Sequence, residues 1–153
     1  MLRAARPEDT PAVVAVFQAA RADALPYLPI IHSSEEDQAF FGSLVDRGLV
    51  TVAELDGAVA GFLALNDDWV DHLYIAPAAQ GQGLGGALLK AAQAQRDRLQ
   101  LWVFQRNTNA IAFYEHHGFA IAERTDGAGN EERTPDARMA WVRPGTAPGP
   151  TPG

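Results

Sequence analysis

Some stretches of the chain have apolar residues at helical spacing and others have short apolar runs typical of strands. Together they predict four helices and about seven strands. Apolar residues three or four positions apart, such as Val13, Val16 and Phe17, indicate the buried face of a helix. Short, almost continuous apolar runs indicate buried strands. Helices are predicted from residue 10 to a break at 25–32, from 34 to a stop at Gly48, from 84 to about 98, and over 107–117. Strands are predicted at 2–5, 49–55, 58–65, 69–75, 99–104, 119–125 and 137–142.

Local capping and turn signals set several of these boundaries. Ser33 is followed three residues later by Glu36, which is the spacing of a helix-starting capping box. The pair Asp56-Gly57 stands between two apolar runs and predicts a two-residue hairpin turn. Two prolines within residues 25–32 hold that segment extended between the first two helices. The resulting order of elements predicts an α/β (α+β) fold with a mixed sheet.

Composition predicts one globular domain followed by a short tail. The 153 residues suffice for a single hydrophobic core, and 47% hydrophobic with 20% charged residues is ordinary for a soluble protein. We place the domain at residues 1–142. Residues 143–153 are rich in proline and glycine and carry almost no apolar side chains, so we expect them to be disordered. The absence of cysteine excludes disulfides, thiolate nucleophiles and sulfur metal sites.

The charge balance narrows the range of partners. Nineteen acidic and twelve basic groups give a net charge of −7, which disfavours nucleic acid and anionic membranes and suits a cationic substrate. The first residues lack a signal-peptide pattern and no apolar run would span a bilayer, so a cytoplasmic protein is expected. The four histidines do not have the spacing of a metal site, and no metal is expected.

A glycine-rich segment, Gln80-Gly81-Gln82-Gly83-Leu84-Gly85-Gly86-Ala87, joins a predicted strand to a predicted helix. Glycines let the backbone approach a ligand, and the first amides of a helix attract phosphate. No Gly-Lys-Ser/Thr follows, so the segment is not a P-loop. Gly81, Gly83 and Gly86 match a dinucleotide fingerprint, but no acidic residue ends the next strand to hold a ribose. A tight turn that needs glycine only for packing remains the other alternative.

Two motifs together resemble one family. Gln80-x-x-Gly83-x-Gly85 resembles the pyrophosphate loop of the GNAT N-acetyltransferases, Q/R-x-x-G-x-G/A. The segment from Asn107 to Phe119 is similar to that family's N-x-x-A-x-x-F-Y-x-x-x-G-F helix. The resemblance spans residues 2–142 and implies the GNAT fold, in which a sheet of about seven strands, flanked by about four helices, is splayed between its fourth and fifth strands.

The resemblance implies that acetyl-CoA (coenzyme A) is the acyl donor, held between the two splayed strands. The backbone of Leu73, Tyr74 and Ile75 would pair with the pantetheine arm, and the loop would hold the pyrophosphate. The implied loop residues are Gln80, Gly81, Gln82, Gly83, Leu84, Gly85 and Gly86. Asn107 would bond the pantetheine region, although an asparagine there is also a good helix N-cap. Many relatives have arginine where this chain has Gln80 and Gln82, so binding here depends on backbone amides.

The same resemblance supplies candidates for catalysis of acetyl transfer to a primary amine. Tyr114 would be the general acid that protonates the departing thiolate. Asp71 is the first candidate for the general base because a base in relatives often lies on that strand, facing the acceptor. Strand alternation puts Asp71 on a face with Trp69 and Leu73, and His72 on the other face with Val70. His72 has the better intrinsic pKa for a base.

The acceptor is open at this stage. Residues 27–32, with Tyr27 and His32, and also His72, are candidates for substrate binding, because the region between the first two helices contributes to substrate choice in the family. The acidic segment 126–132 could bind an ammonium group or be a solvated hairpin tip. A small-molecule amine is expected, with a protein N-terminus or lysine as an alternative. A non-catalytic acyl-CoA-binding module is a second alternative, and the resemblance allows a homodimer.

Overall fold

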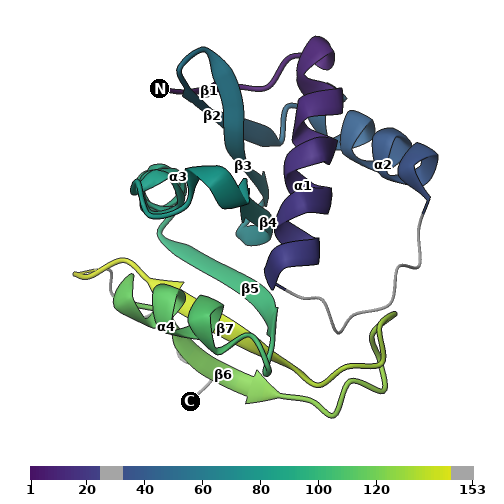
Figure 1. Cartoon of the computed structure of the whole chain (residues 1–153). Coiled ribbons are helices and arrows are strands. Elements are labelled where there is room, and N and C mark those ends of the chain that lie inside the picture. Colours follow the sequence, from purple (N-terminus) through teal and green to yellow (C-terminus); the bar gives the residue numbers. More distant parts are fainter. Residues whose placement is uncertain (25–32, 146–153) are drawn as a thin grey trace.

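The computed structural model describes residues 1–24 and 33–145, which fold into one mixed sheet flanked by helices (Figure 1). Tyr27 and His32 lie outside the described residues, as does the tail from 146 onward. The strands are β1 Leu2–Ala4, β2 Val50–Leu55, β3 Ala58–Asn66, β4 Trp69–Ile75, β5 Arg98–Phe104, β6 Ala120–Arg124 and β7 Asp136–Val142. The helices are α1 Thr10–Ala24, α2 Ser34–Asp46, α3 Leu84–Gln95 and α4 Thr108–His116, with short 3-10 turns at Pro7–Asp9 and Pro77–Ala79.

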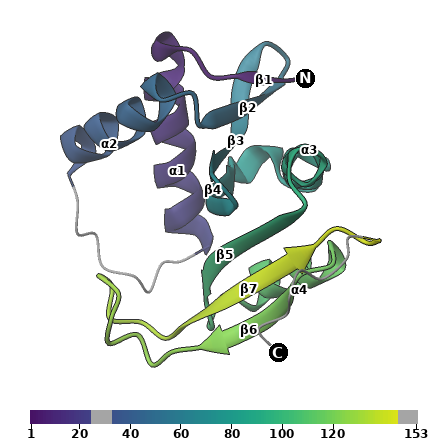
Figure 2. The same ribbon diagram turned by 180° about the vertical axis from the view of Figure 1, so that it is seen from behind.

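The seven strands lie in the order β1-β2-β3-β4-β5-β7-β6, and only β4 and β5 are parallel neighbours. Their pairing is confined to Trp69 opposite Gln100, near the start of both strands. Beyond that point the strands diverge toward Ile75 and Phe104, as both ribbon views show (Figure 2). The expected seven-stranded, splayed GNAT-type sheet is therefore confirmed.

Two hydrophobic clusters hold the helices on opposite sides of the sheet. Helices α1 and α2 cover β2 and β3 through a cluster that includes Val13, Phe41 and Phe62. Helices α3 and α4 cover the other side through a larger cluster that includes Leu88 and Tyr114. The space at the divergence of β4 and β5 thus has helices on both sides.

Most local signals were interpreted correctly. The Ser33 hydroxyl accepts a hydrogen bond from the Glu36 amide and the Glu36 carboxylate accepts one from the Ser33 amide, which completes the capping box. Asp56 and Gly57 have φ of 54° and 80° in the β2–β3 turn, as a two-residue hairpin requires. The expected end of the third helix near residue 98 was wrong, because α3 stops at Gln95 and Arg98 already belongs to β5.

Arg143 anchors the start of the segment that composition assigned to the tail. Its guanidinium donates hydrogen bonds to the carbonyls of Gln93 and Arg96, at 2.8 and 2.9 Å, and to Asp97 at 3.1 Å. These carbonyls lie at the end of α3, where helical acceptors lack partners within the helix. The last turn of α3 is thereby tied to the end of β7. Within residues 1–24 and 33–145, no helix combines the length and apolarity needed to cross a membrane.

Candidate active site

The glycine loop leads into α3 and leaves the first amides of that helix without partners inside the helix. Gly81 and Gly83 have φ of 81° and 80°, and a Cβ at either position would meet nothing within 4 Å. Gly83 is the N-cap of α3, and the first amide that bonds back to it is that of Ala87, at 3.0 Å. The amides of residues 84–86 therefore precede the helical hydrogen-bond ladder. No side chain caps this helix and no acidic residue occupies its first turn, so the positive end of the helix dipole is uncompensated there.

Three elements meet at this helix start. A Cβ on Gly85 would lie 3.5 Å from Phe113 Cζ and 3.6 Å from Ile75 Cγ1, which are ordinary contact distances. The end of β4, the start of α3 and α4 therefore converge. A Cβ on Gly86 would lie 3.3 Å from His117 Nε2, so Gly86 also makes room for the imidazole. The alternative that glycine serves packing holds for Gly86, whereas Gly81 and Gly83 need glycine for their backbone conformation.

The polar side chains of the two motifs have structural partners. Gln80 donates a 3.3 Å hydrogen bond to the carbonyl of Ile75 and closes the loop onto the end of β4. The Asn107 Oδ1 accepts a 3.2 Å hydrogen bond from the Ala110 amide, so Asn107 is the N-cap of α4. The capping interaction occupies Oδ1 only, and a role for the Asn107 amide group toward a cofactor stays a prediction.

A β-bulge in β4 changes the faces that simple alternation predicted. His72 pairs with Ala64 and Val70 with Leu65, so Asp71 between them has no partner on β3. Val70 packs in the same cluster as Leu73, whereas His72 contacts the rings of α1 and α2. The expectation that Val70 and His72 share a face was therefore wrong, because a bulge inserts one residue into the alternation.

Asp71 and His72 occupy different environments. Partial desolvation raises the pKa of the Asp71 carboxyl, while a hydrogen bond with Asn66 and the charge of Arg47 oppose that rise. Burial lowers the pKa of His72 to about 4. Its ring lies 5.0 Å from that of Phe41 and 5.5 Å from that of Phe40. At neutral pH, His72 is therefore an uncharged member of an aromatic cluster.

His72 should make the fold sensitive to acid. Its unfolded pKa is near 6.5 and its folded pKa is lower, so the unfolded chain binds the extra proton and stability falls as pH drops from about 6.5 toward 4. The contribution lost is about 3 kcal/mol at the acid end. We expect His72→Phe to abolish this part of the acid sensitivity, measured by urea unfolding at pH 7.5 and 4.5. An equal difference between variant and wild type at both pH values would contradict the expectation.

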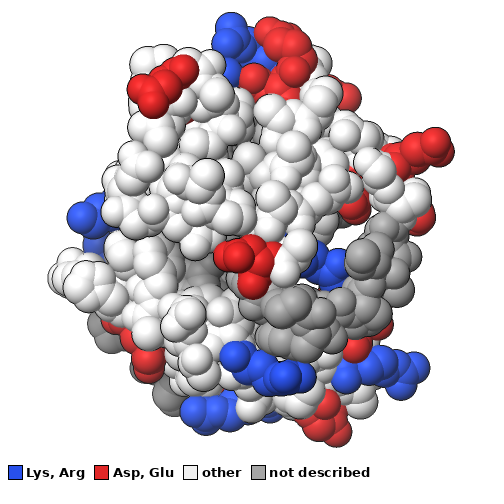
Figure 3. All heavy atoms as spheres, in the orientation of Figure 1, with Lys and Arg blue, Asp and Glu red and all other residues white. Residues whose placement is uncertain are grey.

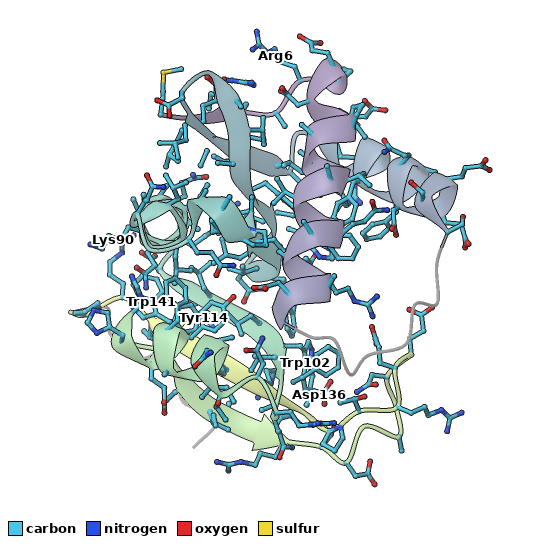
Figure 4. All side chains as sticks on the ribbon, in the orientation of Figure 1. Arg6, Lys90, Trp102, Tyr114, Asp136 and Trp141 are labelled. Atoms are coloured by element: carbon cyan, nitrogen blue, oxygen red, sulfur yellow. The ribbon has the colours of Figure 1, made fainter. Side chains whose placement is uncertain are left out.

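Tyr114 is buried where α4 faces α3 and the sheet (Figure 4). Burial raises its pKa well above the usual value, and the neighbouring Tyr74 raises it further, so the phenol keeps its proton at neutral pH. Burial also raises the pKa of Tyr74, with the charge of Glu132 adding to the effect and Arg21 opposing it. The structure thus places the two tyrosines within electrostatic range of each other, and Asp71 interacts instead with Asn66 and Arg47.

An ion pair that sequence reasoning missed lies beside Tyr74. Arg21 at the end of α1 and Glu132 in the β6–β7 connection approach to 3.8 Å, with side chains 18% and 22% exposed. The acidic character of segment 126–132 was visible in the sequence, but nothing there indicated contact with α1. Next to this pair, Trp102 and Phe104 of β5 line a pocket of about 560 Å³. Among residues 1–24 and 33–145, no group of three or more His, Asp or Glu side chains forms a metal cluster.

Comparison with known proteins defines the class. The model of the acetyltransferase (GNAT) domain matches residues 46–121. The chain is 33% identical over 91 residues to peptidyl-lysine N-acetyltransferase YiaC of Escherichia coli, covering 59% of this chain and 61% of that protein. It is 28% identical to peptidyl-lysine N-acetyltransferase YjaB of Salmonella typhimurium, covering 82% and 86%. It is 31% identical to the 5-NmdU N-acetyltransferase of Pseudomonas phage PaMx11, covering 56% and 69%.

Solved structures support the same fold. Apo YjaB of Escherichia coli superposes with a TM-score of 0.78, at 24% identity and covering 94% of this chain and 97% of that one. The PaiA N-acetyltransferase of Thermoplasma acidophilum, in complex with coenzyme A, gives a TM-score of 0.74 at 20% identity, covering 93% and 98%. The chain belongs to the GNAT family. It is an acetyltransferase.

Proposed function

We propose that this enzyme transfers an acetyl group from acetyl-CoA to a primary amine, with the ε-amine of a lysine as the preferred acceptor. The single observation that carries the donor assignment is the start of α3, where the amides of residues 84–86 precede the helical hydrogen-bond ladder beside Ile75 at the end of β4. Unpartnered helix amides bind phosphate oxygens without a fixed cation. The loop has no lysine or arginine, because Gln80 and Gln82 occupy positions where many relatives have arginine.

The edge of β4 fits the rest of the donor. Pairing between β4 and β5 ends at Trp69–Gln100, so the backbone of residues 73–75 faces β5 without a ladder partner there. An extended pantetheine arm carries amides that suit such an edge. Acetyl-CoA supplies a thioester whose C–S bond breaks as the new C–N bond forms, with one proton leaving the amine and one reaching the sulfur.

Tyr114 is the group we assign to the sulfur. Its burial and raised pKa keep it protonated, so it can donate a hydrogen bond and then its proton to a developing thiolate. Tyr74 of β4, which is half-buried, lies within electrostatic range of this phenol. A buried donor in a dry site is more effective than the same group in water.

Asp71 remains our proposal for the base, acting directly or through water. Asp71→Asn should lower kcat/KM by about 10²-fold because the carboxylate no longer accepts the proton of the amine. The pH profile of kcat/KM should at the same time lose its acid limb. His72→Asn is the matched variant, one residue along the strand. If His72→Asn removes the acid limb and Asp71→Asn does not, His72 is the base.

The acceptor assignment rests on relatives rather than on a bound molecule. The small-molecule amine expected from the sequence now ranks second, since YiaC and YjaB are named peptidyl-lysine N-acetyltransferases. The test is thiol release from acetyl-CoA with a panel of lysine peptides, free amino acids and simple alkylamines. Turnover with lysine peptides above all others supports the proposal. Turnover only with small amines would support the small-molecule acceptor expected from the sequence. Coenzyme A binding without turnover on any amine would contradict the proposed N-acetyltransferase activity.

A further inference from the structure

The pocket beside Trp102 lies on the sheet face opposite α4. Leu99, Leu101 and Val103 of β5 point into the α3–α4 cluster, so Trp102 and Phe104 project from the other face. Figure 4 shows Trp102 and Asp136 beneath the end of α1, in the region bounded by the β6–β7 connection. In Figure 3, Lys, Arg, Asp and Glu side chains lie around the lower part of this face, below α1. Trp102 is 46% exposed, which is unusual for so large an apolar side chain.

The wall formed by the β6–β7 connection is a built structure and not a loose hairpin tip. Asn130 donates a 2.6 Å hydrogen bond to the Thr134 carbonyl and accepts a 3.1 Å one from the Thr134 amide. Gln105 donates to the carbonyls of Thr125 and Asp136, which fastens the ends of the connection to β5. Asp126 and Glu131 are exposed, as the solvated-tip alternative expects, whereas Glu132 is drawn inward against Arg21.

The two carboxylates of the pocket differ in their availability. Asp136 accepts hydrogen bonds from the Thr125 hydroxyl and from Asn130, so its charge serves the connection itself. Glu132 pairs with Arg21 at 3.8 Å, a separation longer than a charge-assisted hydrogen bond. An exposed indole beside a loosely paired carboxylate is the combination that recognises an organic cation. The pocket is accordingly lined by two aromatic side chains, Trp102 and Phe104, and by the Glu132 carboxylate.

The pocket also reaches toward β4, because the charges of Glu132 and Arg21 both act on the phenol of Tyr74, the first raising its pKa and the second lowering it. We propose that the pocket binds a second positive charge of the acceptor molecule, separate from the amine that is acetylated. In the absence of that cation, the guanidinium of Arg21 pairs with Glu132, and the bound cation would compete with it for this carboxylate. This inference rests on the proposed function, and it adds that favoured acceptors are dications.

The test compares substrates that differ by one charge. Two lysine peptides, identical except for arginine or alanine beside the lysine, form one arm, and 1,5-diaminopentane against pentylamine forms the other. We expect wild-type kcat/KM to favour the dication by about tenfold. Glu132→Gln should reduce this preference to about twofold or less, mainly through KM. Glu123→Gln is the matched control, since Glu123 also pairs with an arginine, Arg138, but lies on β6 outside the pocket.

Each outcome decides one claim. Preference in the peptide arm alone identifies the cation as a neighbouring side chain, and preference in both arms identifies it as any alkyl cation. Equal turnover of both charge forms, or a preference that survives Glu132→Gln, overturns the pocket while leaving acetyl transfer intact. If no amine is acetylated, the proposed function fails and the pocket is judged by fluorescence titration of the coenzyme A-saturated protein with 1,5-diaminopentane. There, a saturable signal lost in Trp102→Phe supports the pocket, and no signal overturns it.

Discussion

Tyr114→Phe is expected to lower kcat by about 10²-fold while leaving the affinity for acetyl-CoA unchanged. The variant keeps the buried ring and removes only the proton that we assign to the thiolate. Within the described residues the phenol has no hydrogen-bond partner, so its loss should not destabilise the fold. Steady-state kinetics, calorimetric titration of acetyl-CoA and a thermal melt give the three readouts.

Tyr74→Phe is the matched control, because it removes the half-buried phenol of β4, which is within electrostatic range of Tyr114. A large fall in kcat for Tyr74→Phe with little change for Tyr114→Phe would move the acid role from α4 to β4. Undiminished kcat in both variants between pH 6 and 9 would show that water, and not a tyrosine, protonates the sulfur.

Gly83→Ala is expected to weaken acetyl-CoA binding by about tenfold or more, because it disturbs the amides that we assign to the pyrophosphate. Gly83 has a φ of 80°, which a side chain makes unfavourable by about 1 kcal/mol. No atom lies within 4 Å of the new methyl group, so the effect arises from the backbone and not from a clash. The affinity is measured by calorimetric titration of the variant and the wild type.

Gly57→Ala separates loss of stability from loss of binding. Gly57 also has a φ of 80° and open space around its Cβ, but it lies in the β2–β3 turn. Both variants should lose similar stability, and only Gly83→Ala should lose affinity. If the two variants bind acetyl-CoA equally well, the start of α3 does not hold the pyrophosphate.

The sequence was informative where function depends on local backbone chemistry. The helix starts at Gly83 and Asn107 could be predicted, because the start of a helix and its cap are encoded within a few residues. The faces of β4 could not, because alternation assumes a regular strand and the bulge at Asp71 depends on how β3 pairs with it. The end of α3 at Gln95 also escaped prediction, since apolar spacing did not mark it.

Contacts between distant segments were beyond prediction for a different reason. Arg21 and Glu132 are brought together only because β6 and β7 join the sheet beyond β5, beneath α1. Trp102 stands in an apolar strand, and its exposure follows from the divergence of β4 and β5 rather than from its own neighbours. The residues that we propose to select the acceptor are therefore harder to find from sequence than those that we propose to hold the donor.

The limited pairing of β4 with β5 has a consequence for the enzyme in the cell. In the complex that we propose, an extended acyl carrier completes this interior edge. A ligand that binds only the native state stabilises it by RT ln(1 + [L]/Kd), so the folding equilibrium would depend on the supply of that carrier. Cells rich in activated acetate should therefore retain more of this enzyme intact against proteolysis than starved cells, at equal rates of synthesis.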